Sequence, residues 1–427
     1  MDNPRLIAYK VLLKQEKDKA YSNIVLDSQL SKTKLDTRDR AFVSALFYGV
    51  LERQLTLDYQ LNLYLSKPIK KLKPEVLTIL RMGAYQILFM DKVPDSAAVN
   101  ESIEISKKTG QNYASGLINA VLRKISKNGL VLPANENESE YLSVKYSCPL
   151  WLIEKWKNEY GKKECLNFIK STLGIPDIYI RVNSCKISDE ELIDLLSGEG
   201  VYAEKTQNEH TLKINLSGHD IEKLHSFKEG YFHVQDLASQ LCAQALRAEK
   251  GHTVFDVCSA PGGKTYTIAE IMSNEGKIFA FDIHKSRVEL IMQGAKRLGL
   301  TIIDGKVGDA TVFNDNLGEA DRILCDVPCS GLGIIRRKPE IKYKNQSDFT
   351  NLPDIQFTIL STASRYLKIG GRLVYSTCTL SKAENDDVCN KFLSRNPNFN
   401  LCSPYKTLMP SENGSDGFFI ACIERVS

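Results

Sequence analysis

Two cysteines of this 427-residue chain follow predicted strands, at positions where a thiol can act on a substrate. Cys329 lies in the run D-V-P-C-S-G (326–331), and Cys378 lies in Y-S-T-C-T (375–379). A cysteine is most often a small buried core residue, and we interpret Cys325, inside an apolar strand, in that way. Cys329 and Cys378 instead follow a proline turn and a Ser-Thr pair, which are loop-edge positions where functional residues concentrate.

Such a pair of thiols suits methylation at carbon 5 of a cytosine. Carbon 5 is a poor nucleophile, and a thiolate that adds to carbon 6 makes it electron-rich enough to attack a sulfonium methyl group. A second group must then remove the proton on carbon 5 before the thiolate can leave. A carboxyl group that shares a proton with N3 offsets the charge that develops during the addition, and Asp326 is the candidate. Methylation of oxygen or nitrogen would need no thiol.

A glycine-containing turn, D-V-C-S-A-P-G-G-K-T (256–265), joins a predicted strand to a predicted helix. Gly262 and Gly263 let the backbone approach a ligand, and the amides at the N-terminus of the helix favour a carboxylate or a phosphate. A phosphate-binding P-loop would need a glycine where Cys258 stands, and the G-x-G-x-x-G pattern of dinucleotide-binding proteins is absent. Both of these nucleotide-binding classes are therefore excluded.

Acidic residues stand at the ends of successive predicted strands. Asp282 ends the strand at 277–282, where a carboxylate can accept from both ribose hydroxyls, and Asp309, in V-G-D-A (307–310), follows a further strand, where it can accept from an adenine amino group. One such acid is usually a turn residue or a helix cap. Together with Asp256 they indicate a nucleoside ligand, and S-adenosylmethionine offers a ribose, an adenine and a carboxylate.

These segments require a sheet that brings strand ends to one edge. Apolar strands are predicted at 253–257, 277–282, 322–326, 372–377 and 417–423. Their alternation with helices is typical of a doubly wound α/β sheet with both faces covered. The last strand follows a helix predicted at 382–393, and we expect it to be antiparallel. Both thiols then share an edge with the glycine turn.

Two other regions precede this α/β domain, which we place at 241–427. Residues 1–140 carry apolar residues at helical spacing, so we expect an all-helical domain that ends in a polar linker at 132–140. Residues 141–240 combine helices with short strands, which predicts a small α+β domain.

Composition indicates an ordinary globular protein, with 43% hydrophobic and 25% charged residues. The N-terminus lacks the uncharged core of a secretory signal, and no apolar run reaches the ~20 residues that cross a bilayer. We therefore expect a cytoplasmic protein without membrane contacts. The 11 cysteines form no C-x-x-C pair, so we expect no metal site.

The net charge of +4 is modest, but basic residues are in excess in the N-terminal third. A cluster there contains Lys67, Lys70, Lys71 and Lys73. Such an excess suits a polyanionic partner, although a solvated helix face is the more frequent explanation of charge alone.

The C-terminal two thirds of the chain resemble RNA cytosine-C5 methyltransferases of the Nop2/Sun (NSUN) type. The segments that carry the resemblance are VQDLASQ (234–240), DVCSAPGGKT (256–265), AFDIHKSR (280–287), GDA (308–310), DVPCSGLGIIRRKPEIKY (326–343), LVYSTCTLSKAEND (373–386) and DGFFIACI (416–423). The N-terminal third resembles a NusB-type helical RNA-binding domain, as in RDRAFVSALFYGVLERQLTLDYQL (38–61). A NusB-like head on such a body is similar to the branch of the family that methylates a cytosine of 16S ribosomal RNA.

The resemblance implies a Rossmann-like class I fold that uses S-adenosylmethionine, beside a small RRM-like domain. It makes Cys378 the nucleophile and Cys329 the cysteine that assists product release. It places Asp326 between cofactor and base, and Lys264 near the target base. The implied cofactor contacts are Cys258, Ser259, Ala260, Pro261, Gly262, Gly263 and Lys264 at the methionine end, Asp282 at the ribose, Asp309 at the adenine, and Asp326. Ser259 stands where alanine is frequent in the family, which removes no group with a chemical role.

Contacts with RNA are inferred from charge and position. Arg336, Arg337 and Lys338 follow the release loop, and Arg181 lies in a strand of the small domain, so each is a candidate for a phosphate contact. A structural surface role is nearly as frequent for such residues. We expect a monomer that acts on free or early-assembly 16S RNA, with any paired target base flipped out to reach the thiolate.

Three other functions are compatible with parts of the sequence. A non-catalytic NusB-like RNA-binding protein would not need both cysteines, Asp326 and an intact cofactor loop. A methyltransferase of tRNA or 23S RNA could use the same catalytic body, and only the NusB-like head points to 16S RNA. A methyltransferase of small molecules would have no use for a basic helical head.

Overall fold

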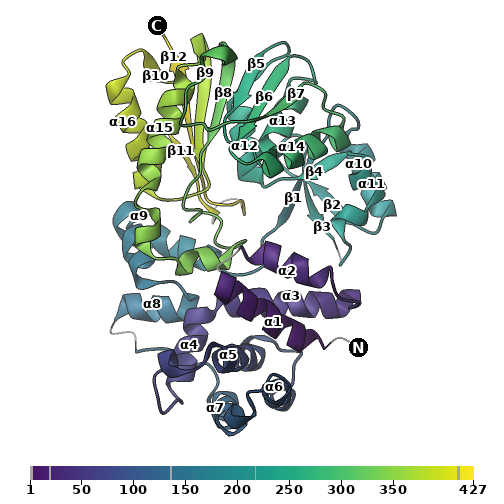
Figure 1. The fold of residues 1–427 in the computed structure, drawn as a ribbon, viewed down its shortest axis with the longest axis vertical. Coiled ribbons are helices and arrows are strands. Elements are labelled where there is room, and N and C mark those ends of the chain that lie inside the picture. The colour runs from purple at the N-terminus through teal and green to yellow at the C-terminus, as the bar shows by residue number, and fades with distance from the viewer. Residues whose placement is uncertain (1–2, 19–20, 135–136, 217, 411–413) are drawn as a thin grey trace. The chain divides into compact units, whose positions relative to one another are not determined.

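The computed structural model describes residues 3–18, 21–134, 137–216, 218–410 and 414–427. Residues 135 and 136 of the predicted linker lie outside the described residues. Packing divides the chain into two compact units (Figure 1). The first unit comprises Met1–Gly174 and Ile335–Lys344, and the second comprises Ile175–Ile334 and Asn345–Ser427.

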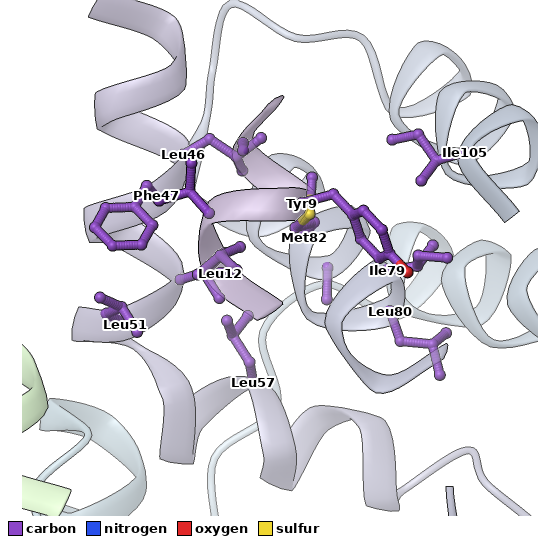
Figure 2. Packing of buried hydrophobic residues seen from close by; sticks show 14 of the residues in the cluster. Tyr9, Leu12, Leu46, Phe47, Leu51, Leu57, Ile79, Leu80, Met82 and Ile105 are labelled. Atoms are coloured by element: carbon purple, nitrogen blue, oxygen red, sulfur yellow. The ribbon is translucent and has the colours of Figure 1, made fainter. Parts of the chain in front are cut away.

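The first unit is helical throughout its described residues. Its helices are α1 (Pro4–Asp18), α2 (Ser22–Leu30), α3 (Thr37–Glu52), α4 (Gln54–Asn62), η1 (Ile69–Lys71), α5 (Pro74–Phe89), α6 (Asp95–Lys108), η2 (Asn112–Ala114), α7 (Ser115–Asn128), α8 (Glu138–Tyr146), α9 (Leu150–Ser171) and η5 (Pro339–Tyr343). Apolar side chains at helical spacing meet in one core, where Leu12, Leu46, Phe47, Ile79 and Met82 pack together (Figure 2). The predicted all-helical head is thus present. Helices α8 and α9, predicted in the small α+β domain, are part of the same compact unit.

A short segment from the middle of the chain, Ile335–Lys344, completes the first unit. Lys342 is fully buried, and its Nζ donates to the carbonyl of Glu52 at the C-terminus of α3 (2.8 Å). Glu340 Oε1 accepts from the backbone N–H of Ser22 at the N-terminus of α2 (2.9 Å). Each charge therefore lies at the helix end whose dipole has the opposite sign. Burial lowers the pKa of Lys342 to about 8.

The second unit contains a small antiparallel sheet with the strand order β2-β3-β1-β4. Its elements are β1 (Ile178–Val182), α10 (Asp189–Gly198), β2 (Tyr202–Lys205), β3 (Thr211–Asn215), η3 (Ile221–Lys223), α11 (His225–Lys228) and β4 (Phe232–Val234). The short strands predicted for this region, at 178–183 and 232–236, correspond to β1 and β4, whereas β2 and β3 were not predicted. The edge strand β2, Y-A-E-K, is almost wholly exposed, so it carries no apolar face that periodicity can detect.

The larger sheet has the strand order β10-β12-β9-β8-β5-β6-β7, and β11 pairs with β12. Its strands are β5 (Thr253–Asp256), β6 (Lys277–Asp282), β7 (Ile303–Val307), β8 (Ala320–Asp326), β9 (Leu367–Thr377), β10 (Phe399–Leu401), β11 (Lys406–Leu408) and β12 (Phe418–Arg425). Strands β5 to β9 pair in parallel, and β12 pairs with β9 in the antiparallel direction, as predicted. The order reverses at β5, between β6 and β8, and ligands bind at the carboxyl ends of strands beside such a switch point.

Helices cover both faces of this sheet (Figure 1), which confirms the predicted doubly wound α/β architecture. The helices are α12 (Leu237–Ala245), α13 (Gly263–Ile271), α14 (Lys285–Leu298), η4 (Asp315–Leu317), η6 (Gln346–Phe349), α15 (Leu352–Ser364), η7 (Lys382–Glu384) and α16 (Asp386–Arg395). Successive strand residues point to opposite faces, so Val254 joins the core under α12 to α14 while Phe255 joins the core under α15 and α16.

The prediction of one continuous helix over 382–393 is wrong, because the structure has two separate helices that are divided at Asn385. A short 3-10 helix, η7, ends at Glu384, and α16 begins at Asp386. The backbone of Asn385 (φ −109°, ψ −94°) lies outside the helical region.

Within the described ranges, no helix combines the length and the apolar character that crossing a bilayer requires.

Candidate functional site

The candidate site lies at the carboxyl ends of three adjacent strands, β5, β8 and β9. Asp256 ends β5, Asp326 ends β8, and Thr377 ends β9. In the parallel pair β8–β9, Asp326 lies opposite Ser376, so the loops that follow leave the sheet side by side. The structure therefore brings the proline turn, the Ser-Thr-Cys segment and the glycine turn to one edge.

Cys329 and Cys378 are in contact, with 3.3 Å between their sulfur atoms. Both side chains are partly exposed. The hydrogen bond to Cys378, together with burial and the charge of Cys378, raises the pKa of Cys329 well above its ordinary value. The two sulfur atoms are therefore close enough to share a hydrogen bond, in which either thiol can be the donor.

The backbone of the Cys329 loop packs directly on the Cys378 loop. The N–H of Gly333 donates to the carbonyl of Cys378 (3.0 Å), and the carbonyl of Gly333 accepts from the N–H of Gly417 (2.9 Å). A Cβ atom on Gly333 would lie 2.0 Å from the carbonyl oxygen of Gly417 and 2.9 Å from that of Cys378. Any larger residue at this position would force the two cysteine loops apart.

A buried carboxylate, Glu384, holds the Cys329 loop from behind. Its oxygens accept from the backbone N–H of Ser330 (2.8 Å), from Ser330 Oγ (2.6 Å) and from Gln356 Nε2 (3.1 Å). Gln356 Nε2 also donates to the carbonyl of Pro328 (2.9 Å). Glu384 thus fixes the residues on both sides of Cys329.

The neighbouring residue, Asn385, holds the Cys378 loop. Its Oδ1 accepts from Thr377 Oγ1 (2.6 Å), and its Nδ2 donates to the carbonyl of Thr379 (3.0 Å). The side chain of Thr379 in turn hydrogen-bonds to that of Ser330 (2.7 Å). One turn between η7 and α16 therefore positions both cysteines.

Sequence reasoning missed Glu384 and Asn385 as site residues because it treated 382–393 as one helix. A signal was present, since Asn385 followed by Asp386 and Asp387 is a typical helix start. That pattern would have placed residues 382–384 outside the helix. No local pattern, however, shows which loops the two side chains reach.

Lys264 and Asp326 form an ion pair beside the thiols, with 2.7 Å between Nζ and Oδ2. Asp326 Oδ1 also accepts from Ser376 Oγ (2.9 Å). Burial is the largest single influence and lowers the pKa of Lys264, but the charge and hydrogen bond of Asp326, together with the nearby cysteines, raise it above its ordinary value. The ammonium group also lies 5.1 Å from the centre of the Phe418 ring, which favours the cation.

The glycine turn lines a cavity of about 210 Å³. Its lining residues are Val234, Gln235, Asp236, Ser239, Asp256, Cys258, Ser259, Ala260, Pro261, Gly263, Lys264 and Asp326. Gly262 has a φ of +108°, which a side-chain-bearing residue rarely adopts, and α13 begins directly after it. Burial raises the pKa of Cys258 well above its ordinary value, so this thiol contributes as a neutral wall.

Two buried polar atoms on this cavity have no hydrogen-bond partner among the described residues. They are the acceptor Asp256 Oδ1 and the donor Gln235 Nε2. The other oxygen, Asp256 Oδ2, accepts from Thr265 Oγ1 (2.6 Å). Since a buried polar atom without a partner is costly, both atoms indicate a polar ligand. An α-amino acid group, such as the methionine end of S-adenosylmethionine, fits these donors and acceptors. Asp256 was predicted only as one of the acids at strand ends, without a cofactor contact of its own, and Gln235 was not predicted as a site residue.

The predicted ribose and adenine acids lie further along the same edge. Asp282 is buried, and its Oδ1 accepts from the N–H of His284 (2.8 Å). Asp309 is exposed and lines a second cavity, of about 550 Å³, with Val257 and Phe281 among its apolar walls. Hydrogen bonds from Thr311 lower the pKa of Asp309, which keeps it an acceptor. Among the described residues, no cluster of three or more His, Cys, Asp or Glu residues is arranged to hold a metal ion.

The structure does not place Arg181 where a contact with RNA requires it. Its side chain is only 3% exposed, and its Nε donates to Glu270 Oε2 (3.1 Å). The expectation of a phosphate contact is corrected for this residue, because its guanidinium group already pairs with a buried carboxylate. Arg336, Arg337 and Lys338 are partly exposed and lie in the segment that belongs to the helical unit.

Three families of known proteins match successive parts of the chain. Residues 2–127 match the NusB family, and residues 148–219 match the ferredoxin-like domain of RsmF/B-like methyltransferases. Residues 243–424 match the family described as 16S rRNA methyltransferase RsmB/F.

Relatives match over nearly the whole length. A Bacillus subtilis protein named probable ribosomal RNA small subunit methyltransferase B is 38% identical, over 99% of this chain and 98% of its own. An Escherichia coli ribosomal RNA small subunit methyltransferase B is 31% identical, over 95% of this chain and 94% of its own. The protein in the crystal structure of PH0851 is 28% identical in sequence, and its structure matches with a TM-score of 0.85 over 100% of this chain and 99% of its own. NSun6 from Pyrococcus horikoshii, solved with SFG, is 25% identical in sequence. Its structure matches with a TM-score of 0.60 over 65% of this chain and 98% of its own.

Replacing Glu384 by alanine should release the Cys329 loop, because Ser330 and Gln356 lose their buried acceptor. A buried donor without a partner costs ~1–3 kcal/mol, so we expect a lower melting temperature. We also expect faster modification of Cys329 by N-ethylmaleimide, measured by mass spectrometry of its peptide. Glu289→Ala, on the exposed face of α14, is the control and should change neither quantity. Equal modification rates in the two variants would show that Glu384 does not hold the loop.

Proposed function

Because the chain belongs to the 16S rRNA methyltransferase RsmB/F family, we propose that it methylates carbon 5 of a cytosine in 16S ribosomal RNA. The observation that carries this proposal is the contact of 3.3 Å between Cys329 and Cys378, at one sheet edge with the cavity of the glycine turn. Only carbon methylation needs two such thiols. The names of the relatives and the match to NusB support 16S RNA over tRNA, 23S RNA or a small molecule.

The methyl donor in this proposal is S-adenosylmethionine, whose sulfonium group supplies an electrophilic methyl group when it is bound. Asp256 offers its unpartnered Oδ1 to the ammonium group of the methionine end. The amides of the glycine turn and of the N-terminus of α13 favour its carboxylate. Asp282 binds the ribose hydroxyls, and Asp309 binds the adenine amino group.

Cys378 is the nucleophile of the proposed reaction. Its sulfur forms a bond to carbon 6 of the cytosine, and the electron pair of the 5,6 double bond becomes available at carbon 5 for the new carbon–carbon bond. The assignment follows the family resemblance, in which the cysteine after Ser-Thr is the nucleophile, and the contact of 3.3 Å places the sulfur of Cys329 beside it.

Cys329 is the base that completes the reaction. Once the sulfur of Cys378 is bonded to carbon, its hydrogen bond and its charge no longer raise the pKa of Cys329, and only burial and the charge of Glu384 still raise it. Cys329 can then give its proton to water and remove the proton on carbon 5. The electrons of that C–H bond restore the 5,6 double bond, and the bond between Cys378 and carbon 6 breaks.

Lys264 and Asp326 face the target base in this proposal. The proton between Lys264 Nζ and Asp326 Oδ2, which are 2.7 Å apart, is placed to be shared with N3 of the cytosine as negative charge builds up there, and Ser376 Oγ holds the other carboxylate oxygen at 2.9 Å. The two residues therefore both orient the pyrimidine edge and offset the charge of the adduct.

Contacts with the remainder of the RNA come from the helical unit. Arg336, Arg337 and Lys338 are partly exposed cations, which suit phosphates, and the match to NusB supports a role of the head in RNA binding. Each residue of the proposed reaction lies in the same chain, which suits a monomer. Because the proposed substrate is free or early-assembly 16S RNA, we place the reaction in the cytoplasm.

The two cysteines should differ in what their loss leaves on the RNA. Cys378→Ala should abolish both methyl transfer and any covalent adduct, since no sulfur reaches carbon 6. Cys329→Ala should accumulate an adduct that survives denaturing electrophoresis, because the proton on carbon 5 stays in place. The measurement is the mobility of labelled 16S RNA after incubation with S-adenosylmethionine. Equal loss of the adduct in both variants would overturn the roles that we assign to the two cysteines.

Bisulfite sequencing of ribosomal RNA tests the substrate. One cytosine of 16S RNA should lose its protection in cells that lack the gene and regain it with the wild-type gene but not with Cys378→Ala. Loss of protection in tRNA or 23S RNA, with 16S RNA unchanged, would overturn the choice of substrate.

Binding of the cofactor product should depend on pH through Asp256, whose pKa burial raises to about 6. Asp326 raises this pKa further, while hydrogen bonding from Thr265 and the charge of Lys264 lower it. Only ionised Asp256 attracts the ammonium group, so S-adenosylhomocysteine should bind more tightly as pH rises from 5 to 7. At pH 5 the affinity should be weaker by up to roughly tenfold.

Calorimetry at each pH measures this dependence. Asp256→Asn keeps an acceptor for Thr265 but removes the titration, so its dissociation constant should vary little over the same range. A wild-type dissociation constant that is flat between pH 5 and 7 would contradict the role of Asp256.

A further inference from the structure

Gln235 has a side chain that the proposed chemistry does not yet use. It is only 6% exposed, and its Nε2 has no hydrogen-bond partner among the described residues. The same side chain lines the cavity of the glycine turn, together with Asp256 and Gly263. A buried amide donor left without a partner costs ~1–3 kcal/mol, which is a reason to look for a ligand acceptor at this place.

The orientation of the Gln235 amide is set by two neighbours. Its Oε1 accepts from Thr267 Oγ1 (2.6 Å) and lies 3.3 Å from His233 Nε2. With the oxygen held on that side, the nitrogen is left to the cavity. A Cβ atom built on Gly263, the first residue of α13, would lie 3.7 Å from Nε2. The free donor therefore lies beside the N-terminus of a helix.

A buried chain of polar groups supports this amide from the small sheet. His233 Nδ1 lies 3.5 Å from Glu270 Oε1, and Glu270 Oε2 accepts from Arg181 Nε (3.1 Å). Arg181 of β1 and His233 of β4 are register partners, and Glu270 lies on α13. All three side chains are at least nine-tenths buried. Arg181 is thus buried as the ion-pair partner of Glu270.

We propose that Gln235 donates a hydrogen bond to the carboxylate at the methionine end of S-adenosylmethionine. The inference rests on the proposed function, and it adds a residue from the small sheet to the cofactor site. The cavity offers an unpartnered acceptor, Asp256 Oδ1, for an ammonium group, and an unpartnered donor beside a helix N-terminus for a carboxylate. These two needs belong together in an α-amino acid. A pyrimidine edge would not call for both a helix N-terminus and a carboxylate.

The test compares two probes that differ in the amino acid moiety. S-Adenosylhomocysteine carries it, and 5′-methylthioadenosine lacks it but keeps the adenosine. Calorimetry of the full-length protein gives the dissociation constant of each probe for wild type, Gln235→Ala, Gln235→Glu and the control Gln207→Ala, an exposed glutamine of the same unit. Binding of 5′-methylthioadenosine also reports whether each variant keeps a folded site.

Gln235→Ala should weaken S-adenosylhomocysteine by roughly 10- to 100-fold, the range for a hydrogen bond to a charged group, and leave 5′-methylthioadenosine unchanged. Gln235→Glu keeps an acceptor for Thr267 and places a second oxygen toward the carboxylate. It should therefore weaken S-adenosylhomocysteine further while still binding 5′-methylthioadenosine. Gln207→Ala should change neither constant.

Several results would overturn the proposal. One is an unchanged affinity for S-adenosylhomocysteine in both Gln235 variants, and another is an equal loss for the two probes. A raised KM for RNA with unchanged S-adenosylhomocysteine binding would assign Gln235 to the target base instead. If wild type bound neither probe, the methyl donor itself would be wrong, and the proposed function would fail together with this inference.

Discussion

The register between β8 and β9 is the constraint on which the site depends. Because Asp326 lies opposite Ser376, the loops that leave these parallel strands start at the same level of the sheet. Cys329 comes three residues after Asp326, and Cys378 two residues after Ser376, so short loops can bring their sulfur atoms together. A slip of one residue in this pairing would turn every side chain of one strand to the opposite face. Backbone hydrogen bonds of the sheet thus contribute to the distance between two thiols that no covalent bond joins.

Much of the fold could be predicted because its strands are apolar and alternate with helices. Burial of both faces of the large sheet leaves a plain pattern, so β5, β6 and β8 were placed close to their observed limits. The polar edge strand β2 leaves no such pattern. The break at Asn385 was missed for a different reason. The helical spacing of apolar residues in α16 was extended back across Asn385, so one helix was predicted there. Local pattern indicates what kind of element forms, whereas a tertiary hydrogen bond decides where it stops.

The candidate site shows the same division. Types and spacing were enough to select the two cysteines and Asp326, the family resemblance added Lys264, and the structure brings these residues to one edge. They were not enough for Gln235 or Glu384, which reach the site through partners distant in sequence. Arg181 shows the opposite failure. A cation in a short strand suggested a surface contact, but its partner Glu270 lies on another element and draws it into the interior. Charge alone does not distinguish a surface cation from one paired inside a protein.

The segment Ile335–Lys344 makes the chain cross between its two units three times, after Gly174, after Ile334 and after Lys344. The helical head is therefore not formed by one continuous N-terminal segment of the chain. A fragment that began after Gly174 would retain these ten residues but lose the helix ends that Glu340 and Lys342 satisfy. The orphaned stretch would follow directly on the Cys329 loop. An exchange of the head for another would keep these contacts only if residues 335–344 were exchanged with it. Head and body thus depend on one another in sequence, although each has its own core.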